Sequence, residues 1–134
     1  MQLTLEDKWE IEQLIARYGH LIDGCEFSRL DEIFTGDALF DLSGYGGDCY
    51  RGLSAIVEMM ASSEEHPLAH HASNIVFEEV LDGPDGVVVT LLSKGLGVGH
   101  RGRVGSVTYR DHLRREAGQW RISARYCELR RSDR

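Results

Sequence analysis

The segment that decides the fold is IARYGHLIDGCEFSRLDEIFTGDALFDL, residues 15–42. It continues an apolar stripe at helical spacing, made of Ile11, Leu14, Ile15, Tyr18, Leu21 and Ile22. Such a stripe predicts an amphipathic helix. Thr4 and Asp7 have the spacing of a capping box, so the helix should start near Leu5. Gly24 is placed to end it.

The remainder of the segment predicts a short helix and then a strand. Residues 26–34, EFSRLDEIF, place Leu30, Ile33 and Phe34 on one face, which favours a second helix. TGD reads as a turn, ALFDL as a strand and GYGGD as a loop. Residues 53–61 carry apolar positions at helical spacing and predict a third helix.

Strand patterns follow Pro67, separated by turn sequences such as LDGPDG and REAGQ. The expected strands are 68–80, 86–100, 103–114 and 119–130. Short turns between long strands indicate an antiparallel meander. Helices followed by a sheet predict the α+β class, with three helices on one face of a curved antiparallel sheet, in one domain over residues 1–134.

The composition limits the partners. The chain has 134 residues, 42% of them apolar, and a formal net charge of −7, so nucleic acid and anionic membrane are not expected partners. The first residues, MQLTLEDKWE, lack the apolar core of a signal peptide. Cys25, Cys49 and Cys127 have no metal-site spacing, which favours a reduced cytoplasmic protein. The arginines of the last two strands are expected to be solvated.

The segment LAHHASN, residues 68–74, places polar side chains in a predicted strand. Strand alternation puts His70 and Asn74 on one face and His71 on the other. Adjacent strand residues cannot easily share one ion, so no metal site is expected here.

A set of motifs runs in order along the chain: a tyrosine-bearing helix with an aspartate at its end, a Phe-Thr-x-Asp-Ala-x-Phe segment, a glycine-initiated helix, a His-x-x-x-Asn strand and a Gly-x-Trp hairpin. The residues that form them are Asp23, Phe34, Thr35, Asp37, Ala38, Phe40, Gly52, Ile56, His70, Asn74, Gly118 and Trp120. In these motifs the sequence resembles the SnoaL-like proteins of the nuclear-transport-factor-like superfamily over nearly its whole length.

The resemblance implies a cone-shaped sheet that encloses a pocket, with the helices closing its mouth. Within the family, the sequence resembles scytalone dehydratase and lindane dehydrochlorinase, cofactor-free lyases with an Asp–His pair at the positions of Asp23 and His70. Ile22 replaces the tyrosine that precedes this aspartate in the dehydratase. The dehydrochlorinase lysine one turn before it is also missing, so neither specific substrate is implied.

An Asp–His pair can remove a proton alpha to a carbonyl group. Asp23 would accept a hydrogen bond from one ring nitrogen of His70, which leaves the other nitrogen as the base. This chemistry requires no cofactor. His100, at the end of a glycine-rich strand, is a second catalytic candidate that could protonate a leaving hydroxyl group.

The remaining site candidates are tyrosines and pocket-wall residues. Tyr45 is a catalytic candidate that could polarise a substrate carbonyl, and Tyr18 and Tyr50 could do the same from substrate-binding positions. Asn74 and Phe40 are expected to contact the substrate. The predicted activity is a dehydratase-type lyase acting on a small hydrophobic, oxygenated or cyclic substrate.

Three alternatives stay open at this stage: an isomerase, a polyketide cyclase on the same scaffold, or a non-catalytic ligand-binding or assembly domain. A homodimer or homotrimer is expected. Its interface is predicted on the strand face that carries Val87, Val89, Leu91, Ile122 and Tyr126.

Overall fold

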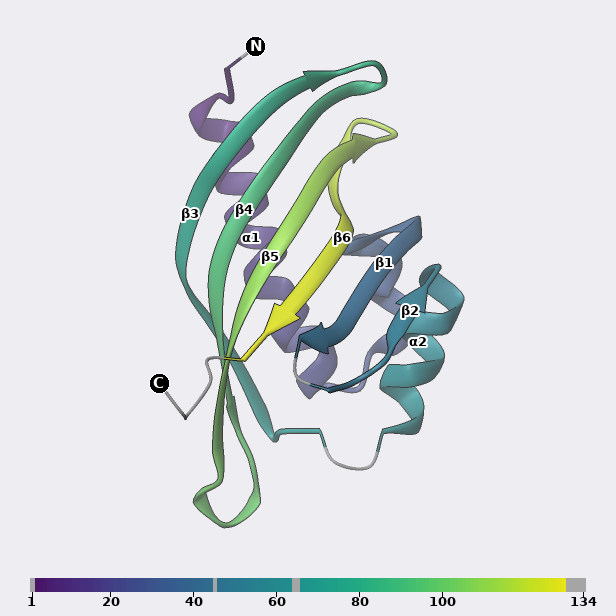
Figure 1. Ribbon diagram of the computed structural model, residues 1–134, viewed down its shortest axis with the longest axis vertical. Coiled ribbons are helices and arrows are strands. Elements are labelled where there is room, and N and C mark those ends of the chain that lie inside the picture. The colour runs from purple at the N-terminus through teal and green to yellow at the C-terminus, as the bar shows by residue number, and fades with distance from the viewer. Residues whose placement is uncertain (1, 45, 64–65, 130–134) are drawn as a thin grey trace.

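The computed structural model describes residues 2–44, 46–63 and 66–129 (Figure 1). Along the chain the elements are α1 (Leu5–Asp23), η1 (Phe27–Glu32), β1 (Phe34–Gly44), β2 (Cys49–Arg51), α2 (Leu53–Ser62), β3 (Ala69–Gly83), β4 (Gly86–Val98), η2 (His100–Gly102), β5 (Val104–Glu116) and β6 (Gln119–Glu128). The predicted α+β class is therefore confirmed.

The six strands form one sheet in the order β2-β1-β6-β5-β4-β3. Consecutive strands from β3 to β6 are antiparallel, as the short turns between them predict. Figure 1 shows these long strands bending in the same direction, with α1 behind them and α2 beside β1 and β2. The apolar stripe of α1 is buried in the core, with Ile11 and Ile15 almost completely inaccessible.

Two local predictions were wrong: the sheet is not antiparallel throughout, and TGD, expected as a turn, lies inside β1. β1 runs parallel to β6, so the sheet is mixed rather than wholly antiparallel. No hairpin joins these two strands, and turn chemistry therefore says nothing about their relative direction. The short helix over residues 26–34 is a 3₁₀ helix, Phe27–Glu32, and the three-residue strand β2 is too short for a period-two pattern to reveal.

The predicted capping box at the start of α1 is present. The Thr4 hydroxyl accepts from the Asp7 backbone N–H, and the Asp7 carboxylate accepts from the Thr4 N–H, both at 3.0 Å. Asp7 is buried, accepts from the Trp120 indole at 3.2 Å and contacts Arg115. The Thr4 backbone N–H, the indole and the Arg115 guanidinium lower the pKa of Asp7 to about 2.

Replacing Asp7 with asparagine should reduce the loss of stability in acid. Because the folded-state pKa lies below the ordinary value of 3.8, the ionised carboxylate stabilises the fold above about pH 4, and this contribution disappears as the pH falls toward 2. Urea unfolding from pH 6 to pH 2 would measure it. We expect the wild-type protein to lose more free energy of unfolding than Asp7→Asn over this range. Parallel pH profiles would contradict the assignment.

The predicted partner face was also wrong. Val89, Leu91 and Ile122 are completely buried in the core that the sheet and α1 share. Val76 lies on the opposite, exposed side of the sheet. In β6 a register shift between Ile122 and Ala124 breaks the alternation and turns Tyr126 away from the core as well. The homodimer or homotrimer stays a prediction, but its interface cannot be the strand face proposed above.

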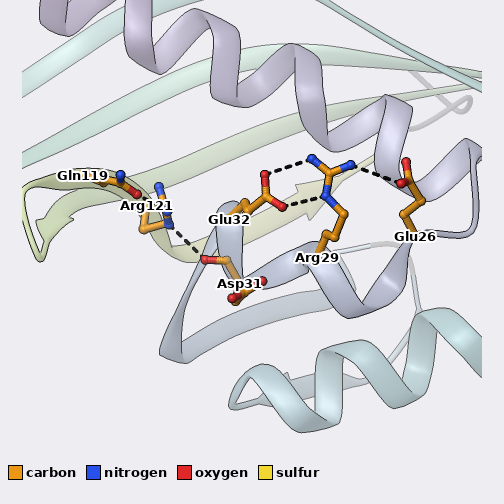
Figure 2. A network of polar contacts seen from close by, with 6 residues as sticks. All are labelled: Glu26, Arg29, Asp31, Glu32, Gln119 and Arg121. Atoms are coloured by element: carbon orange, nitrogen blue, oxygen red, sulfur yellow. Dashed lines mark hydrogen bonds and ion pairs between the residues drawn. The ribbon is translucent and has the colours of Figure 1, made fainter.

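A polar network fixes the turn that follows α1 (Figure 2). The Arg29 guanidinium donates to Glu32 at 2.6 Å and to Glu26 at 3.1 Å. Arg121, at the start of β6, donates to the Asp31 carbonyl oxygen at 2.9 Å. Each exposed contact contributes little to stability. Together they tie η1 to β6 and so define where the chain passes after Asp23.

Within the described part of the chain, neither α1 nor α2 combines the length and the apolar character that a helix needs to cross a bilayer.

Candidate active site

The end of α1 and the start of β3 meet at an aspartate–histidine pair. The Nδ1 atom of His70 lies 2.6 Å from Oδ1 of Asp23, and the two side chains are 17% and 26% exposed. The same carboxylate accepts from the backbone N–H of His70, at 3.0 Å and 3.1 Å for its two oxygens. The carboxylate thus holds both the ring and the strand that carries it.

These contacts select one tautomer of His70. An ionised carboxylate only accepts hydrogen bonds, so the proton of the neutral ring lies on Nδ1. Nε2 then carries a free lone pair and is the atom that can accept a proton from a bound molecule.

Gly19 explains why β3 can approach α1 so closely. A Cβ atom at this position would lie 2.9 Å from the carbonyl oxygen of His70 and 3.4 Å from its Cβ. Gly19 and Asp23 are four residues apart and share a helix face. The helix therefore offers a flat contact to the His70 backbone and, one turn later, a carboxylate to its ring. Glycine inside a helix costs about 1 kcal/mol, so its presence was a signal for such packing.

A pocket of about 330 Å³ lies beside the pair. Its wall is mainly apolar and includes Phe40, Leu42, Met59, Met60, Val107 and Cys127. The polar groups at its border include His70, His66, Tyr18, Tyr109, Ser63 and Ser106. The volume is at the lower end of the range for small-molecule sites. Burial raises the pKa of the Cys127 thiol to about 12, so this thiol is not a nucleophile at neutral pH.

Two tyrosine rings that line the pocket pack against a buried ion pair. Arg125 donates to both carboxylate oxygens of Asp111, at 2.8 Å and 2.9 Å, and both side chains are completely buried. The guanidinium carbon lies 3.8 Å from the ring centre of Tyr109 and 4.5 Å from that of Tyr18. Burial opposes the charge on Arg125, but the Asp111 carboxylate outweighs it and the pKa of Arg125 is raised. Our expectation that the late arginines are solvated was wrong for Arg125.

The structure brings some of the predicted site residues together. Asp23 and His70 are in contact, and Tyr18 and Phe40 are buried and line the same pocket. The Tyr18 ring centre lies 6.4 Å from that of His70. Burial raises the pKa of Tyr18 well above its usual value, so the side chain stays a hydroxyl donor at neutral pH.

Three other predicted site residues, His100, Tyr50 and Asn74, do not line this pocket. His100 lies in η2, beyond the end of β4; it is exposed and borders a depression near Arg103 that adjoins the pocket at His66 and Pro67. Tyr50, on β2, also borders a different depression. Asn74 is exposed at a bulge of β3 with a φ of 57°, which interrupts the alternation that would have placed it beside His70. Tyr45 lies outside the described residues.

His66 was not among the predicted site residues, yet it borders the pocket. Its ring centre lies 6.3 Å from that of His70 in an edge-to-face arrangement. No regular pattern in the loop before β3 distinguishes His66, so sequence reasoning had no basis for selecting it.

The sequence did contain a signal for the buried Asp111–Arg125 pair. Both charges interrupt the apolar, inward-facing positions of their strands, and the register places them opposite each other.

Gly95 controls how closely Tyr109 packs against β4. A Cβ atom at Gly95 would lie 2.4 Å from Cε2 of Tyr109 and 2.8 Å from Cγ1 of Val107. We therefore expect Gly95→Ala to displace the Tyr109 ring and to reduce the free energy of unfolding by about 1–3 kcal/mol. Gly105→Ala is the matched control, because a Cβ atom there, apart from its chain neighbours, would have no heavy atom of the described residues within 4 Å. Equal urea midpoints for the two variants would contradict this packing.

The chain is similar to known proteins in sequence and in fold. The model of the SnoaL-like domain matches residues 3–126. No curated protein gives a significant match. A solved protein of unknown function with a cystatin-like fold, from Nostoc punctiforme, is 25% identical with a TM-score of 0.80, over 98% of this chain and 97% of that chain.

Two further solved structures are similar at lower identity and therefore support the fold alone. LinA is 20% identical with a TM-score of 0.77, over 95% of this chain and 88% of that chain. A candidate scytalone dehydratase from Novosphingobium aromaticivorans is 18% identical with a TM-score of 0.72, over 95% and 86% of the two chains. Because the family model covers nearly the whole sequence, the chain belongs to the SnoaL-like family.

Proposed function

We propose that this protein is a cofactor-independent lyase of the dehydratase type. Its substrate is a small hydrophobic molecule, oxygenated or cyclic, with a proton alpha to a carbonyl group. Nε2 of His70 removes this proton, and the electron pair forms the new double bond as the leaving group departs. Asp23 holds the ring in the required tautomer and stabilises the imidazolium that forms.

One observation carries the proposal: the 2.6 Å contact between Asp23 and His70 at the border of an apolar pocket. A fixed tautomer gives the ring one basic nitrogen, and the apolar wall suits a hydrophobic substrate. Tyr18 can polarise the substrate carbonyl by donating from its buried hydroxyl group. SnoaL-like relatives provide the same kind of scaffold, with a pocket for a small molecule.

Product analysis separates this reaction from the alternatives. The wild-type protein is incubated with cyclic β-hydroxy ketones, and the products are identified by mass spectrometry. Loss of one water molecule supports the lyase. A product of unchanged mass would point to an isomerase or a cyclase instead, and binding without any turnover would point to a ligand-binding domain.

Ring-nitrogen NMR tests the Asp23–His70 pair without a substrate. In the wild-type protein, we expect the neutral His70 ring to carry its proton on Nδ1, because the Asp23 carboxylate accepts a hydrogen bond there. In Asp23→Asn the amide can donate to the ring, and we expect the proton to shift toward Nε2. His112, whose Nδ1 lies 3.2 Å from the Thr90 hydroxyl, is an internal reference that should not change. An unaltered His70 tautomer in the variant would remove the basis of the proposed base.

A further inference from the structure

The proposed reaction has a base but still needs a group that protonates the leaving oxygen. A hydroxide ion leaves poorly, so general-acid catalysis at this oxygen has a large effect. His100 is a weaker candidate, since it is exposed in η2 and borders a depression that adjoins the pocket at His66 and Pro67, without lining the pocket itself. The raised pKa values of the Tyr18 hydroxyl and the Cys127 thiol make both groups poor proton donors at neutral pH.

We propose that His66 is the second catalytic residue, which protonates the leaving hydroxyl group through Nδ1. This inference rests on the proposed function and names the acid that completes it. His66 lies in the connection between α2 and β3 and is half-buried at the border of the pocket that His70 also lines.

The surroundings of His66 fix both the position and the tautomer of its ring. Nε2 lies 2.8 Å from the carbonyl oxygen of Met60, in the last turn of α2. A carbonyl oxygen only accepts, so Nε2 carries a proton in the neutral and in the charged ring alike. The Phe27 ring is stacked at 6.2 Å between centres. Among the described residues, none forms a hydrogen bond with Nδ1, which is therefore the nitrogen that can exchange a proton with a ligand.

The two imidazole rings are suitably spaced for one elimination. Their centres are 6.3 Å apart and both border the same pocket. A base and an acid that act on neighbouring carbon atoms must each come within about 3 Å of the group they serve, and rings at this separation can do so from one side of a substrate. His71 also borders the pocket, but it is exposed, and no hydrogen bond or ring contact to another described residue holds it.

The proposed step balances in protons and electrons. Nε2 of His70 takes the proton from the alpha carbon, and the electron pair of that C–H bond forms the C=C bond. The C–O bond breaks with its electron pair on oxygen, which takes the proton from Nδ1 of His66 and leaves as water. His66 is then neutral with its proton on Nε2. Solvent accepts a proton from His70 and returns one to His66 before the next cycle.

Two probes that differ in their need for an acid test this assignment. 3-Hydroxycyclohexanone must lose a hydroxyl group, so its dehydration requires both a base and a proton donor. 5-Nitrobenzisoxazole opens when a base removes its ring proton, and the stabilised phenolate that leaves requires no proton. The variants are His66→Gln, His70→Gln and, as the matched control, His112→Gln, which lies on the strand face opposite to the buried Asp111 and Leu113.

We expect His66→Gln to slow the dehydration by about 10²–10⁴-fold and to change the ring opening by less than about threefold. Retained ring opening also shows that the variant is folded with a working base. Unchanged dehydration would overturn the assignment of His66. Equal losses in both reactions would overturn it too, because they indicate a structural role. If the wild-type protein opens the benzisoxazole but dehydrates no β-hydroxy ketone, the role of His66 as the acid is excluded, while the role of His70 as the base is retained.

Failure of the proposed function itself gives a different result. In that case the wild-type protein has neither activity, or His70→Gln retains both. Either outcome would contradict the assignment of His70 as the base, and therefore also the reaction in which His66 is the acid.

Discussion

Replacing His70 with glutamine is expected to lower turnover by about 10²–10⁴-fold while leaving the fold intact. Glutamine keeps the size of the side chain and can still donate to Asp23, but its amide has no nitrogen that accepts a proton at neutral pH. The side chain is 17% exposed and lies at the border of a pocket, so little core packing is lost. Steady-state kinetics on a substrate identified by the product analysis would measure the effect.

The matched control for this prediction is His112→Gln. His112 lies on the outward face of β5, where Nδ1 is 3.2 Å from the Thr90 hydroxyl and the ring packs edge-to-face with Tyr126. We expect kcat in this variant to stay within about threefold of the wild-type value. A His70→Gln protein that turns over as fast as the control would show that proton abstraction occurs elsewhere.

Replacing Arg125 with methionine is expected to reduce the free energy of unfolding by about 3–5 kcal/mol. The substitution leaves the Asp111 carboxylate completely buried without its bidentate partner. It also removes the cation that packs against the rings of Tyr18 and Tyr109. Urea unfolding at neutral pH, monitored by circular dichroism, would measure the change.

A second variant separates an unpaired charge from a general loss of packing. Removing both charges, with Asp111→Leu and Arg125→Met together, leaves no buried ion uncompensated. Replacing a whole buried pair with apolar residues is often close to neutral. We therefore expect the double variant to recover most of the stability lost in Arg125→Met. A double variant that is less stable than the single one, or a single variant that costs under about 1 kcal/mol, would contradict this account.

The local elements could be predicted from the sequence because their signals are local. The α1 stripe, its capping box and the hairpin turns after Pro67 depend only on neighbours in the chain, and the observed elements follow them closely. The parallel pairing of β1 with β6 depends on residues about 85 positions apart, such as Phe40 and Arg125. No periodicity in either strand encodes that direction.

The site was predictable to the extent that the family pattern and strand alternation apply. The family pattern selected Asp23 and His70, and these two residues are in contact. Alternation failed at Asn74, because a residue with positive φ introduces a bulge that no short pattern reveals. His66 depends on the course of a connection, and Gly19 on the approach of a distant strand. A glycine inside a helix signals close packing, but which strand packs there, and where His66 lies, follow from the assembled fold rather than from local sequence.

The pairing of β1 with β6 has a consequence for how the chain is synthesised. β1 leaves the ribosome well before its neighbour β6, because β2, α2 and the strands β3, β4 and β5 come between them in the chain. Until then, β1 offers an unpaired edge, and the hydrophobic surface beneath it is uncovered. A nascent chain that stops before residue 119 lacks β6 altogether and keeps that edge open. Truncated products of this protein should therefore depend on chaperones and aggregate readily, even though they contain every residue of the aspartate–histidine pair.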